Sequence, residues 1–313
     1  RFGDVPNYVE PFFGSGAVLL ARPDEHDWRQ RVETVNDADG LLCNFWRAVQ
    51  ADPDAVAEYA DWPVNENDLH ARHYWLVQQK VSLRAKLEGD PNYYCARAAG
   101  WWVWGIGTWI ASAWCNTRGP WVAIDGELVK RERGRGETTE DPEGVCRQLP
   151  HLGDNGMGVH RKTVNIYELM QELSDRLRRV RVCCGDWSRV TGPTPTTKHR
   201  VTGMFLDPPY SHDERDNDLY CVETDCAQDV LQWCLANGDD PKLRICLCGY
   251  DGEHNALEQL GWTAYAWKAA GGYGSRSNGR GKANAHRERL WFSPHCLHQD
   301  AGTFTLAIEG GIL

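Results

Sequence analysis

Hydrophobic and polar positions along the chain follow two alternating patterns, one typical of strands and one typical of helices. Residues 8–13 and 32–35 read as strands that each lead into a polar turn, and residues 41–50 then carry apolar side chains at helical spacing. The same alternation returns after residue 161. These segments predict an α/β protein in which strands and helices alternate around one doubly wound sheet.

Further elements of this pattern follow residue 161. We expect helices at 165–178, 227–237 and 254–260, and strands at 180–184, 203–206, 243–248, 262–267 and 289–292. Each expected strand is short and apolar, as strands buried on both faces of a sheet are.

Residues 51–161 interrupt the alternation. Helical segments come first, followed by an uncharged stretch rich in Trp, Gly and Ala at 98–117 and a polar, glycine-rich stretch at 130–158 that is typical of an exposed loop. Residues 98–117 are long enough to cross a bilayer, but their scarcity of Leu, Val and Ile favours a buried helix or helix pair. We therefore expect one α/β domain, formed by residues 1–50 and 162–313, with a mainly helical insert.

Composition narrows the class of protein. Hydrophobic residues make up 42% and charged residues 25% of the 313 positions, as in ordinary globular proteins. The formal net charge of −10 argues against a uniformly basic surface, although a local basic patch remains compatible with it. The twelve cysteines include no C-x-x-C pair, so we expect reduced thiols rather than disulfides or zinc. His70 and His73 lack nearby metal-binding partners in the sequence, and we expect them to be structural.

Polar residues follow several of the predicted strands, at the carboxyl ends where open α/β sheets bind their ligands. The first strand leads into E-P-F-F-G-S-G at 10–16, whose glycines let a ligand approach the backbone closely. Asp37 ends the second strand, about 20 residues after the glycines, where an acid commonly binds ribose; capping of the next helix by Asp37 or Asp39 is the alternative. The third strand leads into Asp186 and Trp187, an acid for an amino group beside a ring for stacking, or else an ordinary strand-to-turn junction.

The fourth strand ends in D-P-P-Y at 207–210, where two prolines remove two N–H donors and fix two φ angles. With this motif the chain resembles the DNA adenine methylase (Dam) family of S-adenosylmethionine-dependent methyltransferases. The resemblance covers most of the chain and rests on Y-V-E-P-F-F-G-S-G (8–16), N-D-A-D (36–39), G-D-W (185–187) and D-P-P-Y, in that order. It implies a Rossmann-like methyltransferase sheet whose inserted, mainly helical region recognises the target.

The resemblance also implies roles for individual residues. The residues expected to hold S-adenosylmethionine are Glu10, Phe12, Gly14, Ser15, Gly16, Asp37, Asp186 and Trp187. The expected catalytic residues are Asp207, Pro208, Pro209 and Tyr210. Family members begin with a short Gly-Gly-Lys segment that has no counterpart in this sequence, so we expect the chain to start after it.

The chemistry of the D-P-P-Y motif suits an exocyclic amino group. The adenine amine is a poor nucleophile because its lone pair is delocalised into the ring, and the Asp207 carboxylate and Pro208 carbonyl would accept its two N–H bonds. Since a base inside a duplex cannot reach such a pocket, we expect the base to be flipped out. Tyr210 would then stack on the flipped base, with a core aromatic at a strand end as the alternative.

A glycine-rich stretch at 268–289 combines several Lys and Arg residues with a single acid. We expect Arg276, Arg280 and Lys282 to contact DNA phosphates, with a solvated surface loop as the alternative. Such a patch would let an acidic protein bind DNA.

These features predict a monomeric enzyme of a bacterial or phage-infected cytoplasm, with no metal and no membrane segment. It would methylate the N6 amino group of adenine in double-stranded DNA and release S-adenosylhomocysteine. A restriction endonuclease partner is compatible with this function. Methylation of cytosine N4 poses the same electronic problem and stays open, as does a nucleic-acid-binding relative without turnover, although Asp at position 207 resembles the adenine enzymes.

Overall fold

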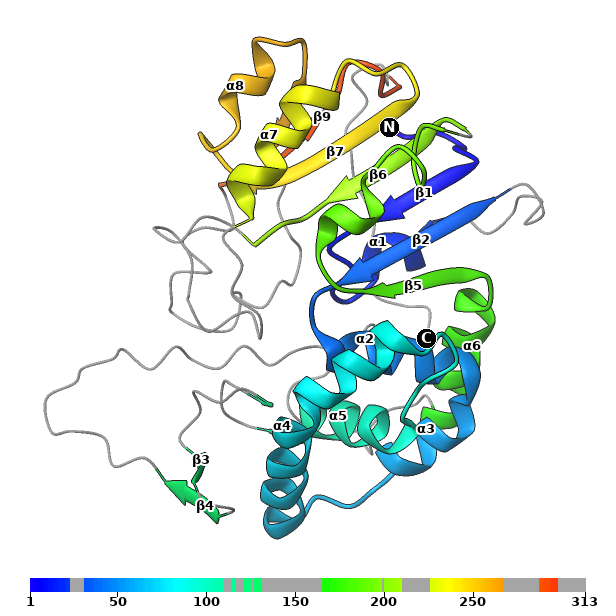
Figure 1. Ribbon diagram of the computed structural model, residues 1–313, viewed down its shortest axis with the longest axis vertical. Helices are drawn as coiled ribbons and strands as arrows, with labels where there is room; N and C mark the ends of the chain where they lie inside the picture. The colour runs from blue at the N-terminus through cyan, green and yellow to red at the C-terminus, as the bar shows by residue number, and fades with distance from the viewer. Residues whose placement is uncertain are drawn as a thin grey trace, which may run out of the picture.

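A computed structural model describes residues 1–22, 31–109, 114–115, 121–124, 127–130, 165–198, 200–209, 226–266 and 287–297. In these ranges the chain forms a seven-stranded sheet in the order β5-β2-β1-β6-β7-β9-β8, and a separate two-stranded sheet (Figure 1). The strands from β5 to β7 in this order run parallel, and β9 pairs antiparallel with both β7 and β8. The architecture is therefore α/β with a mostly parallel sheet, compatible with a Rossmann-like fold.

The strands of the large sheet are β1 Asn7–Glu10, β2 Val32–Asp37, β5 Val180–Cys184, β6 Thr202–Leu206, β7 Leu243–Tyr250, β8 Thr263–Ala266 and β9 Glu288–Phe292. The helices are α1 Ala17–Leu20, α2 Gly40–Ala51, α3 Pro53–Ala60, α4 Glu66–Gly89, α5 Ala96–Thr108, α6 Ile166–Leu177, α7 Ala227–Asn237 and α8 Asn255–Glu258, with a 3-10 turn, η3, at Trp187–Val190. The small sheet pairs β3 Trp121–Ile124 with β4 Glu127–Lys130. The order of strands and helices outside residues 51–161 is the predicted one, whereas the β3-β4 hairpin was not predicted.

The first strand is shorter than its apolar run suggests. It was expected to reach residue 13 but ends at Glu10, before Pro11, which has no N–H to donate to a neighbouring strand. Phe13 instead donates its N–H to the carbonyl of Asn36, with 2.9 Å between N and O, and so ties the loop after β1 to the end of β2.

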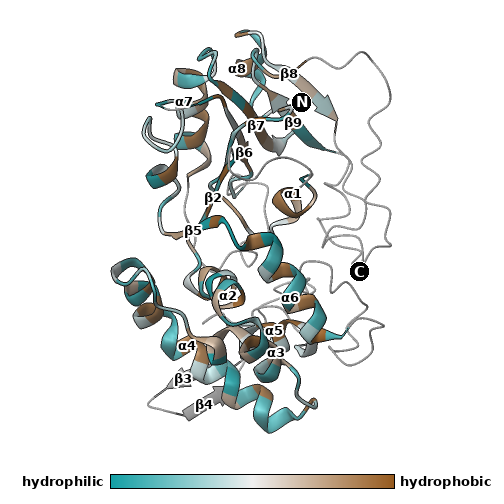
Figure 2. Ribbon diagram, turned by 90° about the vertical axis from the view of Figure 1, so that its right-hand side faces the viewer, coloured by the Kyte–Doolittle hydropathy of each residue, from teal (hydrophilic) through white to brown (hydrophobic). Residues whose placement is uncertain are grey.

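Two hydrophobic clusters cover the two faces of the large sheet. Tyr8 belongs to the cluster that includes α1, α2 and α6, whereas Val9 belongs to the cluster that includes α7 and α8. This division follows from the geometry of a strand, in which successive side chains point to opposite faces. Figure 2 shows α1 and α7 on opposite sides of the strands accordingly.

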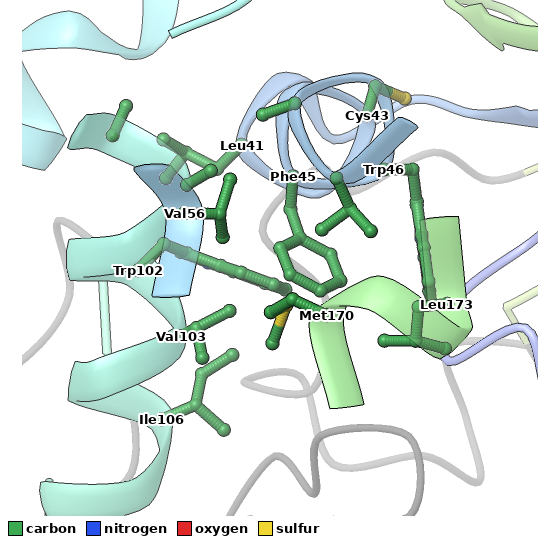
Figure 3. Packing of buried hydrophobic residues seen from close by; sticks show 14 of the residues in the cluster. Leu41, Cys43, Phe45, Trp46, Val56, Trp102, Val103, Ile106, Met170 and Leu173 are labelled. Atoms are coloured by element: carbon green, nitrogen blue, oxygen red, sulfur yellow. The ribbon is translucent and has the colours of Figure 1, made fainter. Parts of the chain in front are cut away.

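Helices α3, α4 and α5 pack in the same hydrophobic cluster as α2 and α6. Figure 3 shows Phe45 of α2 pointing between Trp102 of α5 and Met170 of α6, and the Phe45 and Trp102 ring centroids are 5.6 Å apart. Gly100 lies where α5 meets α3, and a Cβ at this position would lie 2.6 Å from the carbonyl oxygen of Val56. The small residues of the Trp-rich stretch thus permit close helix packing, and its described part forms the expected buried helix.

None of the helices that the structure describes combines the length and the apolar composition needed to cross a membrane. His73 packs within the Trp-rich region, where its ring stacks on Trp109 with 4.9 Å between centroids and its Nδ1 accepts the N–H of Cys115. Burial lowers the pKa of His73 to about 4, so the ring is neutral. Within the described ranges no cluster of His, Cys, Asp and Glu could hold a metal, and the cysteines form no disulfide.

A network of three charged side chains ties α1 and α6 to the sheet. Glu33 of β2 accepts hydrogen bonds from Arg22, at 2.7 Å, and from Arg176 of α6, at 2.8 Å. Arg176 also donates to the carbonyl of Leu19 at 2.9 Å. The Glu33 side chain is only 11% exposed, so the two guanidinium groups depend on its charge for compensation.

We predict that Glu33→Gln lowers the free energy of unfolding by about 3 kcal/mol, because two largely buried cations lose their shared counter-charge. Urea denaturation measures this change. Glu88→Gln is the matched control, since its partner Arg84 lies 3.0 Å away on the exposed surface of α4 and such pairs contribute below about 1 kcal/mol. Equal losses in the two variants would contradict a stabilising role for the buried network.

Candidate active site at the carboxyl edge of the sheet

The strand order reverses between β1 and β6. From β1 the chain continues through β2 to β5 on one side, and then crosses to β6 and β7 on the other. In open α/β sheets a reversal of this kind leaves a crevice outside the carboxyl ends of the two central strands. Strands β1 and β6 lie side by side (Figure 1). Glu10 ends β1 and Asp207 follows β6, so both acids lie at this point.

The loop at 11–16 is bound tightly to the end of β2. Besides the Phe13 bond, the N–H of Gly14 donates to Oδ2 of Asp37 at 3.0 Å. Gly14 and Gly16 have φ angles of 48° and 70°, a left-handed conformation that glycine adopts readily. A Cβ on Gly16 would also lie 2.8 Å from the Phe13 ring. The loop therefore needs both glycines, and it leaves Gly14 and Ser15 exposed.

Asn36 joins the carboxyl ends of β1, β2 and β5. Its buried side-chain amide donates to the carbonyl of Pro11 at 3.1 Å and to that of Gly185 at 3.0 Å, while the N–H of Gly185 donates to the carbonyl of Asp37. The loops after β1, β2 and β5 are thus held together by one side chain. Asn36 opens the N-D-A-D motif at 36–39, but no role was predicted for it from the sequence.

The two acids at the end of β2 and just after it, Asp37 and Asp39, make different contacts. Asp39 caps α2, since its side chain accepts the N–H of Leu41 at 2.9 Å. Asp37 is not the cap; its Oδ1 accepts the N–H of Asp39 at 2.9 Å, and its Oδ2 faces Gly14. Burial raises the pKa of Asp37 to about 6, although these backbone donors oppose the rise. The alternative of helix capping therefore applies to Asp39, and Asp37 lies half-buried beside the glycine loop.

Asp186 and Trp187 lie at the end of β5. The Asp186 carboxylate accepts the N–H of Ser188 at 2.9 Å and caps the 3-10 turn, so its described contacts are those of a strand-to-turn junction. Trp187 is buried, and its ring stacks on Phe12 with 6.2 Å between centroids. The two rings join the ends of β5 and β1, and their contact with a cofactor stays a prediction.

Glu10 is buried beside the D-P-P segment. Glu10 is 2% exposed, and its Oε2 accepts a hydrogen bond from the Tyr8 hydroxyl, with 2.9 Å between the oxygens. Burial raises the pKa of Glu10 to about 8; the charge of Asp207 adds to the rise, and the Tyr8 hydrogen bond opposes it. Asp207 itself is exposed, whereas Pro208 and Pro209 are buried. An exposed carboxylate is therefore held by a rigid, anchored segment next to an acid that is protonated at neutral pH.

Glu288 is a further acid at this edge that sequence analysis did not select. It begins β9 opposite Tyr250 of β7. Burial raises the pKa of Glu288 to about 7, and the charge of Asp207 contributes to the rise. Because β9 is antiparallel to β7, its first residue returns to the edge where the parallel strands end, and no pattern in the sequence indicated this pairing. Acids that raise one another's pKa in a crevice favour a positively charged ligand.

Four of the predicted site residues, namely Tyr210, Arg276, Arg280 and Lys282, lie outside the described part of the chain. The other predicted residues converge on the ends of β1, β2, β5 and β6. A comparison of the sequence with models of known protein families and with curated proteins finds no match. The case for function therefore depends on the residues of the site.

The pKa of Glu10 generates a prediction for stability. The folded state holds a proton on Glu10 up to about pH 8, whereas the unfolded state releases that proton near pH 4.5. The free energy of unfolding of the wild type therefore falls as pH rises between these values. Glu10→Gln keeps an acceptor for Tyr8 but cannot ionise. We expect its free energy of unfolding to fall less than that of the wild type over this range, by up to about 1.4 kcal/mol per pH unit.

Urea denaturation at a series of pH values measures the difference. The control is Glu66→Gln, which changes an exposed acid in the first turn of α4. A Glu10→Gln profile parallel to that of the wild type would show that Glu10 is ionised in the folded protein at neutral pH.

Proposed function

We propose that this protein is a methyltransferase that uses S-adenosylmethionine to methylate the N6 amino group of adenine in double-stranded DNA. The observation that carries the proposal is the position of Asp207-Pro208-Pro209. This segment follows β6 at the reversal of strand order. The neighbouring strand is β1, which ends in Glu10 and leads into the glycine loop. A rigid, acceptor-only segment at a ligand-binding crevice suits an amine nucleophile.

The described residues fit the proposed cofactor. When bound, S-adenosylmethionine supplies a methyl group on a positively charged sulfur. Glu10 and Asp37 are acids with raised pKa values at the same edge, and a cation nearby would favour their ionised forms. Exposed backbone at Gly14 and Ser15 permits close approach, and the Asp37 carboxylate is held where the strand-end acid of such sheets binds ribose.

The roles of the catalytic residues follow from their chemistry. The exposed Asp207 carboxylate accepts one N–H of the target amine, and the Pro208 carbonyl accepts the other. These bonds favour a pyramidal nitrogen whose lone pair is free to attack. Both prolines are buried and lack N–H donors, so the acceptors are held in place before the base arrives. Cytosine N4 would use the same acceptors, and the target-recognition role of residues 51–161 stays a prediction.

Asp207→Ala should abolish methyl transfer and leave cofactor affinity nearly unchanged, because Asp207 acts on the amine. Transfer of radiolabelled methyl groups to DNA gives the rate, and mass spectrometry of the product nucleosides distinguishes N6-methyladenine from N4-methylcytosine. Asp251→Ala, at an exposed acid paired with Arg289, is the control. A variant at position 207 that retains a tenth of the wild-type rate would refute the assigned role.

Asp37→Ala should weaken cofactor binding by about 10- to 100-fold, since a hydrogen bond to a charged group contributes roughly 1.5–3 kcal/mol. Isothermal calorimetry measures the affinity. Asp39→Ala serves as the matched control, because loss of the α2 cap should lower stability by about 1 kcal/mol without affecting the cofactor. Equal affinities in the wild type and Asp37→Ala would assign Asp37 to holding the loop alone.

A further inference from the structure

Three acidic side chains form a row at the carboxyl edge of the sheet. Glu10 ends β1, Asp207 follows β6 and Glu288 begins β9. The charge of Asp207 contributes to the raised pKa of both flanking acids, so the three interact across the edge. Asp207 is the middle member of the row.

Strand register places Asp207 and Glu288 on the same face of the sheet. Phe205 pairs with Cys246, so position 207 aligns with Cys248, two residues further along β7. On the other side of β7, Cys248 pairs with Leu290 and Tyr250 pairs with Glu288. Positions two apart share a face, so both acids project from the same side. The backbones of β6 and β9 lie about 10 Å apart, on either side of β7.

The two flanks of Asp207 differ. On one flank lie β1 and β2, which carry Glu10, the glycine loop and Asp37, the residues proposed to hold the cofactor. On the other flank lie β7 and β9, which carry Glu288. Asp207 is proposed to bind the amine of the target base while that amine faces the cofactor. Because the cofactor is proposed to lie on the β1 and β2 side of Asp207, the rest of the base lies on the β7 and β9 side.

We propose that Glu288 lines the target-base side of the crevice, and that its carboxylate stabilises the positive charge that develops on the attacking amine. This inference rests on the proposed function. In the transfer, the nitrogen lone pair forms the N–C bond while the C–S bond breaks and leaves its electron pair on sulfur. The nitrogen becomes positively charged and then releases a proton to water. Because the amine starts neutral, a nearby anion stabilises the transition state more than the bound substrate.

Several charged and titratable groups lie around Glu288 at the start of β9. The charge of Asp207 acts on Glu288 across the face of the sheet, with Cys248 and Tyr250 of β7 between the two acids. Arg287 precedes Glu288 in the chain and Arg289 follows it on β9. Arg289 donates to Asp251 at 3.2 Å, and the Arg287 guanidinium lies over the Tyr250 ring, 5.4 Å from its centroid. Burial and the Asp207 charge hold the pKa of Glu288 at about 7, so the group changes charge near neutrality.

The first experiment measures single-turnover methyl transfer against pH, with cofactor and DNA saturating. The wild-type rate should rise through about pH 7 as Glu288 ionises and then level off. Glu288→Gln should lose this rise and be about tenfold slower on the plateau, with cofactor affinity unchanged. Asp251→Asn removes one negative charge from the same edge and should keep the wild-type profile. A Glu288→Gln variant with the wild-type rate and profile overturns the proposal.

The second experiment does not depend on turnover. Carboxyl ¹³C NMR, with the Glu288 resonance identified by its loss in Glu288→Gln, should show a titration near pH 7 that moves to lower pH in Asp207→Asn. A midpoint in the ordinary range of glutamate, unchanged by Asp207→Asn, overturns the proposed acid pair. If the titration is as expected but wild-type protein transfers no methyl group, the proposed function fails, and the role of Glu288 fails with it.

Discussion

The reversal of strand order between β1 and β6 is the constraint on which the rest of the site depends. Parallel strands end at one edge, and the reversal directs the connections after β1 and β6 away from each other. Residues far apart in sequence, such as Glu10 and Asp207, consequently meet across two adjacent strands. Asn36 then holds the surrounding loops in place through the carbonyls of Pro11 and Gly185.

Acids at this edge are kept in an environment that resists their ionisation. Burial raises the pKa values of Glu10, Asp37 and Glu288, and Asp207 lies between two of them. Such an arrangement lowers stability near neutral pH and is therefore more typical of a functional site than of a structural one. It favours a cationic ligand, as the proposed cofactor is, and a reaction in which positive charge moves onto an amine.

The helices of the segment 51–161 pack into the hydrophobic core next to the carboxyl edge of the sheet. Side chains of α3, α4 and α5 share a hydrophobic cluster with α2, which directly follows the capping acid Asp39. Close contact at Gly100 leaves little room for α5 to shift against α3. A partner bound by these helices would therefore be held in a fixed relation to Asp37 and the glycine loop, as target recognition by this segment would require.

The sequence by itself determined the order of strands and helices outside residues 51–161, because side-chain periodicity records locally whether one face or both faces of an element are buried. It also predicted the strand-end residues that converge, including Asp37, Asp186 and the D-P-P segment. Only the tertiary structure decided that Asp39 rather than Asp37 caps α2, that Trp187 is buried against Phe12, and that Glu288 joins Asp207. The last two contacts depend on strand order and register, which bring together residues far apart in the sequence, and no local pattern encodes that pairing.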